Sequence, residues 1–250
     1  VAAALELFQN WVLIHDDIVD DSDERRGKPA LHRIHGMPLA LNAGDALHVY
    51  MWQAVFQSPK PVESEFLNMI HRTAEGQHID LAWVQGNRWD VSTQDYLHMV
   101  QLKTAYYTVS IPLRLGALVA GHTPHPQFIE AGLSLGAAFQ IRDDVLNLTA
   151  NSQGYGKEIG GDLLEGKRTL IISHFLESAD PNQKAFFIRT MNQTRSQKKP
   201  HDIEQIKAWI LESGAIEQAM ETAKRESKRG LDLLETIFQE IPNSIFAEEI

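Results

Sequence analysis

The chain has 250 residues, 43% of them hydrophobic, and a formal net charge of -10 at pH 7, so it can bury a sizeable core, and its acidic balance argues against a general nucleic-acid-binding surface. It contains no cysteine, which excludes disulfides, thiolate nucleophiles and zinc-thiolate sites. No apolar run approaches the roughly 20 residues of a transmembrane segment, and the N-terminus lacks the basic region of a signal peptide, so the sequence predicts a cytoplasmic protein without transmembrane segments.

The chain opens on Val1 rather than on a methionine, and a helical pattern is already under way at its first residues. The first chemical motif begins soon afterwards, at Asp16. We therefore expect residues 1–250 to form one domain that is N-terminally incomplete.

Apolar residues recur at helical spacing along most of the chain. They predict helices over 2–20, 39–56, 65–83, 92–121 and 126–148, a helix entry at Asp180 and Pro181, a helix that ends near Glu212, and a last helix that reaches about Gln239. The first helix is apolar on most of its surface, which predicts a central position, and Pro112 predicts a kink or an end in the fourth. No segment alternates as strands do. The predicted fold class is all-α, with a single large helical bundle.

The first acidic cluster stands at the end of the first predicted helix. In a helix, Asp16, Asp17 and Asp20 crowd one end of one face, because they are separated by three or four residues. Like charges at this spacing repel, and a bound cation reverses that penalty. Oxygen ligands without histidine or cysteine suit Mg2+ or Mn2+, and Mg2+ completes its shell with water and phosphate oxygens. A solvated acidic helix end is the commoner explanation of an isolated pair, but it explains poorly why this cluster directly follows apolar residues.

A second acidic pair, Asp143 and Asp144, ends another apolar helix, with Gln140 and Asn147 one turn to either side. Two such helices that face each other would hold carboxylates around several metal ions, with a polyvalent phosphate between them. Arginine chelates phosphate oxygens through a fork, and lysine acts as a mobile point charge. The basic residues that could bind this phosphate are Arg25, Arg26, Lys103, Lys157 and Lys167.

These motifs together resemble the trans-isoprenyl diphosphate synthases of the polyprenyl synthetase family, over most of the chain up to about Leu176. The two Asp-rich motifs carry the resemblance, and segments 76–80, 103–105, 156–157 and 160–167 also match family segments. The chain is most similar to the short-chain geranylgeranyl or farnesyl diphosphate synthases. The resemblance implies an isoprenoid-synthase-type bundle around a central cavity, with the two Asp-rich helices facing each other.

The resemblance also implies a reaction, the Mg2+-dependent condensation of an allylic diphosphate with isopentenyl diphosphate. Three Mg2+ ions, or Mn2+ in their place, would be held by Asp16, Asp17, Asp20 and Asp143, with Asp144 and Asn147 in the outer part of the site. The allylic diphosphate would contact Arg25, Lys103, Thr104, Gln140, Lys157 and Lys167. The second diphosphate would contact Gln9 and Arg26. Catalysis would rest on Asp16, Asp17, Asp20, Arg25, Lys103, Asp143 and Lys157, with no histidine general base, because metal and lysine charges stabilise the leaving pyrophosphate.

Two features depart from the family pattern. Asn147 occupies the third acidic position of the second motif, so that corner should bind metal weakly or through water; an asparagine there resembles geranylgeranyl diphosphate synthases. The basic segment that family members carry upstream of the first motif has no counterpart here, so we expect an incomplete site for isopentenyl diphosphate.

The apolar residues before Asp16 bear on product length. Trp11 lies five residues earlier, about 7.5 Å along a helix axis, and Phe8 lies roughly one turn deeper. In the family, an aromatic residue at the position of Trp11 resembles synthases of C15 to C20 products. Val12 is not the second aromatic residue of many farnesyl diphosphate synthases, so C20 is favoured over C15. The alternative is that Trp11 is an ordinary core residue.

Three other functions stay open from the sequence: a class I terpene cyclase, a longer-chain polyprenyl diphosphate synthase, and the non-catalytic partner subunit of such an enzyme. The last would be expected to lose Asp or Lys residues from the motifs, and this chain retains them. Family analogy and the all-round apolar helices favour a homodimer.

Overall fold

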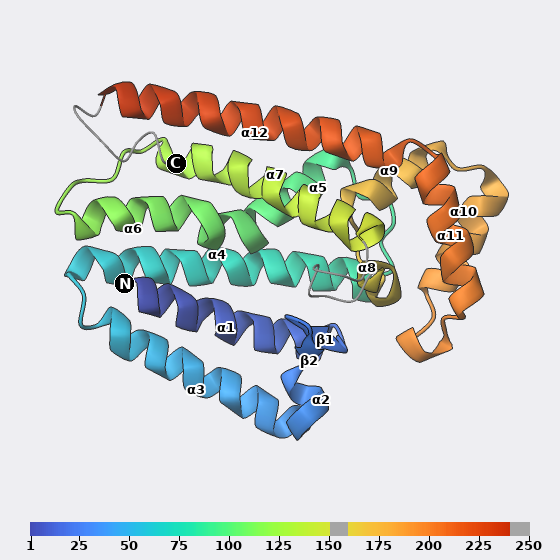
Figure 1. The fold of residues 1–250 in the computed structure, drawn as a ribbon, viewed down its shortest axis with the longest axis horizontal. Coiled ribbons are helices and arrows are strands. Elements are labelled where there is room, and N and C mark those ends of the chain that lie inside the picture. The colour runs from blue at the N-terminus through green and yellow to red at the C-terminus, as the bar shows by residue number, and fades with distance from the viewer. Residues whose placement is uncertain (151–159, 241–250) are drawn as a thin grey trace.

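The computed structural model describes residues 1–150 and 160–240, whose long helices run alongside one another (Figure 1). These are α1 (Ala2–Val19), α3 (Met37–Val55), α4 (Lys60–Gln85), α7 (Phe128–Thr149) and α12 (Ala215–Glu240). A further helical run has three parts, α5 (Thr93–Val100), the π-helix η1 (Gln101–Ser110) and α6 (Ile111–Val119). The predicted all-α class is confirmed.

Shorter elements join the long helices. They are the strands β1 (Glu24–Arg25) and β2 (Lys28–Pro29), the helices α2 (Leu31–His35), α8 (Gly161–Glu165), α9 (Leu170–Ser178), α10 (Pro181–Met191) and α11 (Pro200–Glu212), and the 3-10 turn η2 (Arg195–Gln197). The helices α10 and α11 stand across one end of the bundle, at the right of Figure 1. None of the described helices is both long and apolar enough to cross a membrane.

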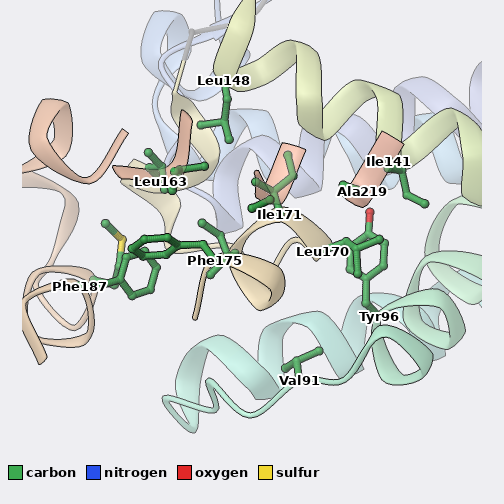
Figure 2. Close-up of a cluster of buried hydrophobic side chains, with 14 of the residues drawn as sticks. Val91, Tyr96, Ile141, Leu148, Leu163, Leu170, Ile171, Phe175, Phe187 and Ala219 are labelled. Atoms are coloured by element: carbon green, nitrogen blue, oxygen red, sulfur yellow. The ribbon is translucent and has the colours of Figure 1, made fainter. Parts of the chain in front are cut away.

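Besides a smaller cluster between α7 and α12, two larger apolar clusters hold the described helices together. One joins α5, α7, α9 and α10 around Tyr96, Ile141, Phe175 and Phe187, and it includes Leu163 of the short helix α8 (Figure 2). The other joins α1, α3, α4 and α6. Helix α7 packs between α12 and η1, α4 packs against η1, and α1 packs mainly against α3. Burial of apolar surface of this kind is the main favourable contribution to folding.

The position of α1 differs from the central one that its apolar surface predicted. Its fully buried residues are Ala4, Phe8 and Asp17. Val19 is 52% exposed, and Trp11 and Val12 line a cavity on one side while they pack against the cluster of α1, α3, α4 and α6 on the other. The apolar residues around α1 therefore serve two purposes: some pack in the core, and others form a wall of the cavity.

Several helix boundaries follow the predicted capping chemistry. Ser92 and Asp95 form a reciprocal capping box at the start of α5, and Asp180 accepts hydrogen bonds from two backbone amides at the start of α10. Helix α4 begins at Lys60, five residues before the predicted start at Glu65. The predicted start was too late because Pro61 lies in the first turn, where a proline costs no helical hydrogen bond.

Pro112 lies in the first turn of α6, directly after the π-helix η1, and the helical run continues past it to Val119. The sequence predicted a kink or an end at this proline. The helix does not end there, but the change from π-helix to α-helix falls directly before it. Hydrogen bonds in a π-helix span one residue more than in an α-helix, which widens the helix, and π-helical turns occur often at functional sites. In this chain the widened segment carries Lys103, Thr104 and Tyr107 into the cavity described next.

Candidate active site

A cavity of about 660 Å³ lies between α1, α4, the α5–η1 run, α7 and the turn that joins α8 to α9. Its charged lining includes Asp16, Asp20, Arg25, Asp80, Lys103, Asp143 and Lys167. Its apolar lining includes Phe8, Trp11, Val12, Ile70 and Tyr107. Residues from both Asp-rich motifs thus meet at one cavity, although more than a hundred residues separate them in the chain.

The first motif reaches the cavity through Asp16 and Asp20, which are one turn apart at the end of α1. The amide nitrogen Nε2 of Gln77 donates to Asp16 Oδ1 at 3.0 Å, and Lys103 Nζ lies 3.6 Å from the same oxygen. Lys167 Nζ donates to Asp20 Oδ2 at 2.6 Å. Each carboxylate therefore faces an ammonium group that comes from a different part of the chain.

Asp80 is a site residue to which the sequence argument assigned no role. It is 3% exposed and accepts from Lys103 Nζ at 2.6 Å and from Lys167 Nζ at 3.4 Å. The sequence signal was present in the segment 76–80, which matches the family, because Gln77 and Asp80 share one face of α4 at helical spacing. Asp80 thereby holds the two lysines on the same side of the cavity.

Gly76 permits this arrangement. A side-chain Cβ at its position would lie 2.2 Å from the backbone nitrogen of Lys103, so only glycine lets α4 approach η1 this closely. Gly136 of α7 does the same against Ala105 of η1, where a Cβ would lie 2.4 Å from the Ala105 Cβ. The π-helix η1 therefore packs closely between α4 and α7, and this packing holds the backbone of Lys103 in place.

Burial raises the pKa of Asp80, but Lys103 and Lys167 outweigh it and hold that pKa well below its ordinary value. Burial likewise opposes the charge of Lys103, but Asp16 and Asp80 raise its pKa above the ordinary one. Burial and the charge of Asp16 raise the pKa of Asp20, and burial and the charge of Asp20 raise the pKa of Glu165 to about 7. The pKa of Asp20 and that of Glu165 are raised mainly by burial and also by neighbouring carboxylates, so acidic groups crowd this end of the cavity.

A tight hairpin orients the basic residues that follow the first motif. Arg26 and Gly27 both have positive φ values, 56° and 71°, as the two-residue turn between β1 and β2 requires. Arg25 points inward and donates from Nε to both oxygens of Asp17, at 2.9 and 3.2 Å. Arg26 is more exposed and donates to Asn10 Oδ1 at 3.2 Å. Asp17 is 3% exposed and is absent from the cavity lining, so the structure places it against Arg25.

On α7, the carboxylate of Asp144 accepts from the hydroxyl of Tyr96 at 2.6 Å and from Gln140 Nε2 at 2.8 Å. The hydroxyl of Thr104 donates to Gln140 Oε1 at 3.0 Å, which completes a chain of hydrogen bonds from η1 to α7. Burial and the nearby Asp144 charge raise the pKa of Tyr96 well above its ordinary value, so the phenol stays a donor. Asp144 is thus held by neighbouring side chains, whereas Asp143 is less buried at the same cavity.

Asn147 lies one turn beyond Asp143, and its Oδ1 accepts the backbone N–H of Asp162 at 3.2 Å. It therefore ties α7 to α8, a contact that its place in the second motif did not indicate. Gln9 and Arg26 also line the cavity. The predicted phosphate ligand Lys157 lies outside the described residues.

The apolar part of the cavity has aromatic walls. Phe8 contacts Trp11 and Tyr107 edge to face, with ring centroids 5.7 and 5.6 Å apart. Trp11 stacks on His48 of α3 at 4.1 Å, and Trp52 Nε1 donates to that histidine at 2.9 Å. The sequence indicated Phe8 and Trp11, but the support from α3 comes from residues that no motif identified.

The potential metal ligands at the charged end of the cavity fit a divalent cation that also binds phosphate. They are carboxylate oxygens, and His15, which also lines the cavity, directs its Nε2 toward Leu41 and Asp45 of α3. In the described part of the chain, no three histidine or acidic side chains lie close enough together to hold a metal ion by themselves. A cation at this site therefore takes part of its shell from water or from phosphate oxygens, as Mg2+ does.

The family model for polyprenyl synthetase matches residues 1–210. The chain belongs to the polyprenyl synthetase family. As a polyprenyl synthetase it is 32% identical over 245 residues to the geranylgeranyl diphosphate synthase of Sulfolobus acidocaldarius, which covers 94% of this chain and 72% of that protein. It is 40% identical over 186 residues to the geranylfarnesyl diphosphate synthase of Natronomonas pharaonis, with 69% of this chain and 52% of that protein covered.

Solved structures of polyprenyl synthetases share this fold. The geranylgeranyl pyrophosphate synthase of Corynebacterium glutamicum, complexed with isoprenyl diphosphate and magnesium, matches with a TM-score of 0.83 at 30% identity, over 94% of this chain and 72% of that chain. The polyprenyl synthase of Caulobacter crescentus, complexed with calcium and isoprenyl diphosphate, matches with a TM-score of 0.82 at 29% identity, over 94% and 71%. The predicted family, bundle type and trans-prenyltransferase class are thereby confirmed.

Proposed function

We propose that this prenyltransferase condenses an allylic diphosphate with isopentenyl diphosphate to make a short-chain trans prenyl diphosphate, with C20 favoured over C15. One observation carries the proposal: a single cavity combines carboxylates and lysines at one end with an aromatic-walled apolar region at the other. A substrate with a polyanionic head and a hydrocarbon tail has both of these properties.

Asp16, Asp20 and Asp143 would hold the metal, which we propose to be three Mg2+ ions, with Mn2+ as a substitute. When bound, these ions supply positive charge that stabilises the departing pyrophosphate. We propose Asp17 and Asp144 for the outer part of the site, because their carboxylates already bind Arg25, Tyr96 and Gln140.

The chain's own cations bind and orient the allylic diphosphate. Lys103 and Lys167 are held by acidic side chains at the cavity wall, so their ammonium groups are positioned before a ligand arrives. The other proposed contacts are Arg25, Thr104, Gln140 and Lys157. Gln9 and Arg26 would contact the diphosphate of isopentenyl diphosphate. Alignment of the two substrates and stabilisation of leaving-group charge are the two contributions that this arrangement provides.

Product length would be limited where Phe8 and Trp11 close the apolar end of the cavity. Their ring contacts with Tyr107 and His48 hold a wall in place that a longer hydrocarbon chain would have to displace. This feature favours a short product over the longer-chain alternative. A class I terpene cyclase would use an allylic diphosphate without consuming isopentenyl diphosphate.

We further propose a homodimer. Large apolar side chains that are more than half exposed gather on residues 34–67: Ile34, Met37, Leu39, Val49, Tyr50, Phe56 and Leu67. A contiguous exposed apolar patch marks an interaction surface, and we propose that these residues form one. Light scattering on the purified protein should give twice the monomer mass.

A cytoplasmic location stays a prediction.

The decisive experiment is incubation of the purified protein with farnesyl diphosphate, labelled isopentenyl diphosphate and Mg2+, followed by chromatography of the dephosphorylated products. We expect label in a C20 alcohol, and no product after chelation of divalent metal. Pyrophosphate release without incorporation of label would indicate a cyclase instead. No turnover of any C5 to C15 allylic diphosphate would overturn the proposal.

A further inference from the structure

Two buried cations, Lys198 and Arg168, surround the turn between α8 and α9, outside the residues that the proposed mechanism uses. Their residues are 8% and 3% exposed. Among the described residues, neither forms an ion pair with a carboxylate; both instead bind backbone carbonyls. Burial of a charged group without a counter-charge is costly, so these two residues need an explanation.

Lys198 binds the end of α8. Its Nζ donates to the carbonyl oxygens of Leu163 and Leu164, at 3.1 and 2.5 Å. Carbonyls in the last turn of a helix lack a partner within the helix, and this ammonium group supplies a donor to the Leu164 carbonyl. The Leu163 carbonyl also accepts the backbone N–H of Gly166 at 3.2 Å. The Leu163 side chain packs into the apolar cluster near Phe175 and Phe187 (Figure 2). Helix α8 is therefore held by the packing of the Leu163 side chain and by the bonds of Lys198 to its backbone carbonyls.

Arg168 binds the backbone immediately before Lys167. Its guanidinium donates to the carbonyl of Gly166 and, from Nε, to the carbonyl of Arg88 at 2.9 Å, and it lies 3.7 Å from the ring centroid of Trp89. Lys198 Nζ and Arg168 NH1 would both lie 3.6 Å from a Cβ at Gly166. Both cations thus meet at the residue that precedes Lys167.

Lys167 itself continues from this turn into the cavity. Its backbone N–H donates to the carbonyl of Asp162 at 2.9 Å, and its ammonium group reaches Asp20 and Asp80. A lysine side chain has several rotatable bonds, so the place of its ammonium group depends on where its backbone is held.

We propose that Lys198 and Arg168 are positioning residues, which hold the carbonyls before Lys167 so that its ammonium group stays at the charged end of the cavity. The proposal rests on the proposed function of that cavity. Because Lys198 lies between η2 (Arg195–Gln197) and α11 (Pro200–Glu212), it also connects the helices at the end of the bundle to the site.

The protonation of Lys198 supports this geometry. Burial, together with the nearby charges of Arg168 and Arg195, lowers the pKa of Lys198 to about 8, while Glu165 acts in the opposite direction. The charged form is therefore less favourable in the folded protein than in the unfolded chain, so replacing Lys198 by an apolar residue of similar length should leave the protein folded.

A double-mutant cycle tests the proposal. Lys198→Met should lower kcat/KM for the allylic diphosphate roughly tenfold to a hundredfold, because small displacements of a binding group are costly in a preorganised site. Lys199→Met, which removes the neighbouring exposed lysine, should leave kcat/KM unchanged. In the Lys167→Met background, Lys198→Met should have no further effect, because a residue that acts through Lys167 loses its influence with it.

Equal effects of Lys198→Met in both backgrounds, or unchanged kcat/KM in the single variant, would overturn the proposal. Urea unfolding of each variant separates positioning from loss of fold. If Lys198→Met does not fold, Lys198→Gln takes its place in the cycle, since its amide can still donate to one carbonyl. A wild-type protein without prenyl transfer would instead contradict the proposed function.

Discussion

Asp16 and Asp17 are neighbours in the sequence, but their carboxylates lie in different environments. Asp16 lines the cavity beside Gln77 and Lys103, whereas Asp17 is buried against Arg25. The difference follows from helix geometry, because consecutive residues point about 100° apart around an α-helix. A motif read only as a cluster of acids assigns both residues to the metal, and the structure separates them.

We expect different kinetic consequences at these two positions. Asp16→Asn should lower kcat roughly a hundredfold or more and raise the Mg2+ concentration needed for half-maximal rate, because it removes charge at the proposed metal site. Asp17→Asn should leave that Mg2+ concentration unchanged and raise KM for the allylic diphosphate, because it loosens Arg25. Steady-state kinetics at graded Mg2+ concentrations measures both. Equal Mg2+ shifts in the two variants would count against the separation.

Trp11 offers a second prediction for a single residue. Trp11→Ala should lengthen the products by one or more five-carbon units, because it removes the indole that packs against Phe8 and His48. Chromatography of the product alcohols measures chain length. Trp209→Ala, which alters an indole outside the cavity lining that packs against Phe186, serves as the control and should leave the distribution unchanged. Unchanged products from Trp11→Ala would show that Trp11 does not limit chain length.

At the scale of elements, the contact between α4 and the π-helix η1 decides where Lys103 lies. Gly76 and Gly136 allow α4 and α7 to approach η1 from two sides. The π-helical turn then presents Lys103, Thr104 and Tyr107 to the same cavity. A proline and two scattered glycines are weak signals in a sequence, so neither the π-helix nor the close helix contacts were predicted.

Gly76→Ala tests this contact. The added methyl group would lie 2.2 Å from a backbone nitrogen of η1, so we expect a loss of about 1–3 kcal/mol in the free energy of unfolding, as for other overpacked positions. Gly116→Ala on α6 meets nothing within 4 Å and should be neutral or stabilising by up to about 1 kcal/mol. Urea denaturation compares the two variants. Similar stabilities would mean that the close approach does not constrain η1.

At the scale of the whole molecule, the buried ammonium group of Lys198 should make stability depend on pH. Its folded-state pKa of about 8 lies below the ordinary value of 10.5, so the unfolded chain binds more protons between these two pH values. The contribution of this residue to the free energy of unfolding should therefore rise from pH 8 to 10.5. Urea midpoints of the wild type and Lys198→Met across this range isolate the effect. Parallel curves would contradict the lowered pKa.

The family and the all-α class were predicted from the sequence and are confirmed, and many residues that the sequence indicated line the cavity. These follow from local information: helical periodicity, capping residues such as Ser92 and Asp180, and acidic pairs one turn apart. Such signals depend on residues close together in the chain, so helices and acidic pairs can be predicted from the sequence alone.

Only the tertiary structure decided which of these residues share the cavity. Asp80 joined the site, Asp17 was placed on Arg25, and Asn147 was found to bind the backbone of α8. The lysines Lys103 and Lys167 meet at Asp80 from helices that are distant in the chain. The physical reason is that charge pairing, burial and close helix contacts depend on distances across the fold, which a one-dimensional pattern does not contain.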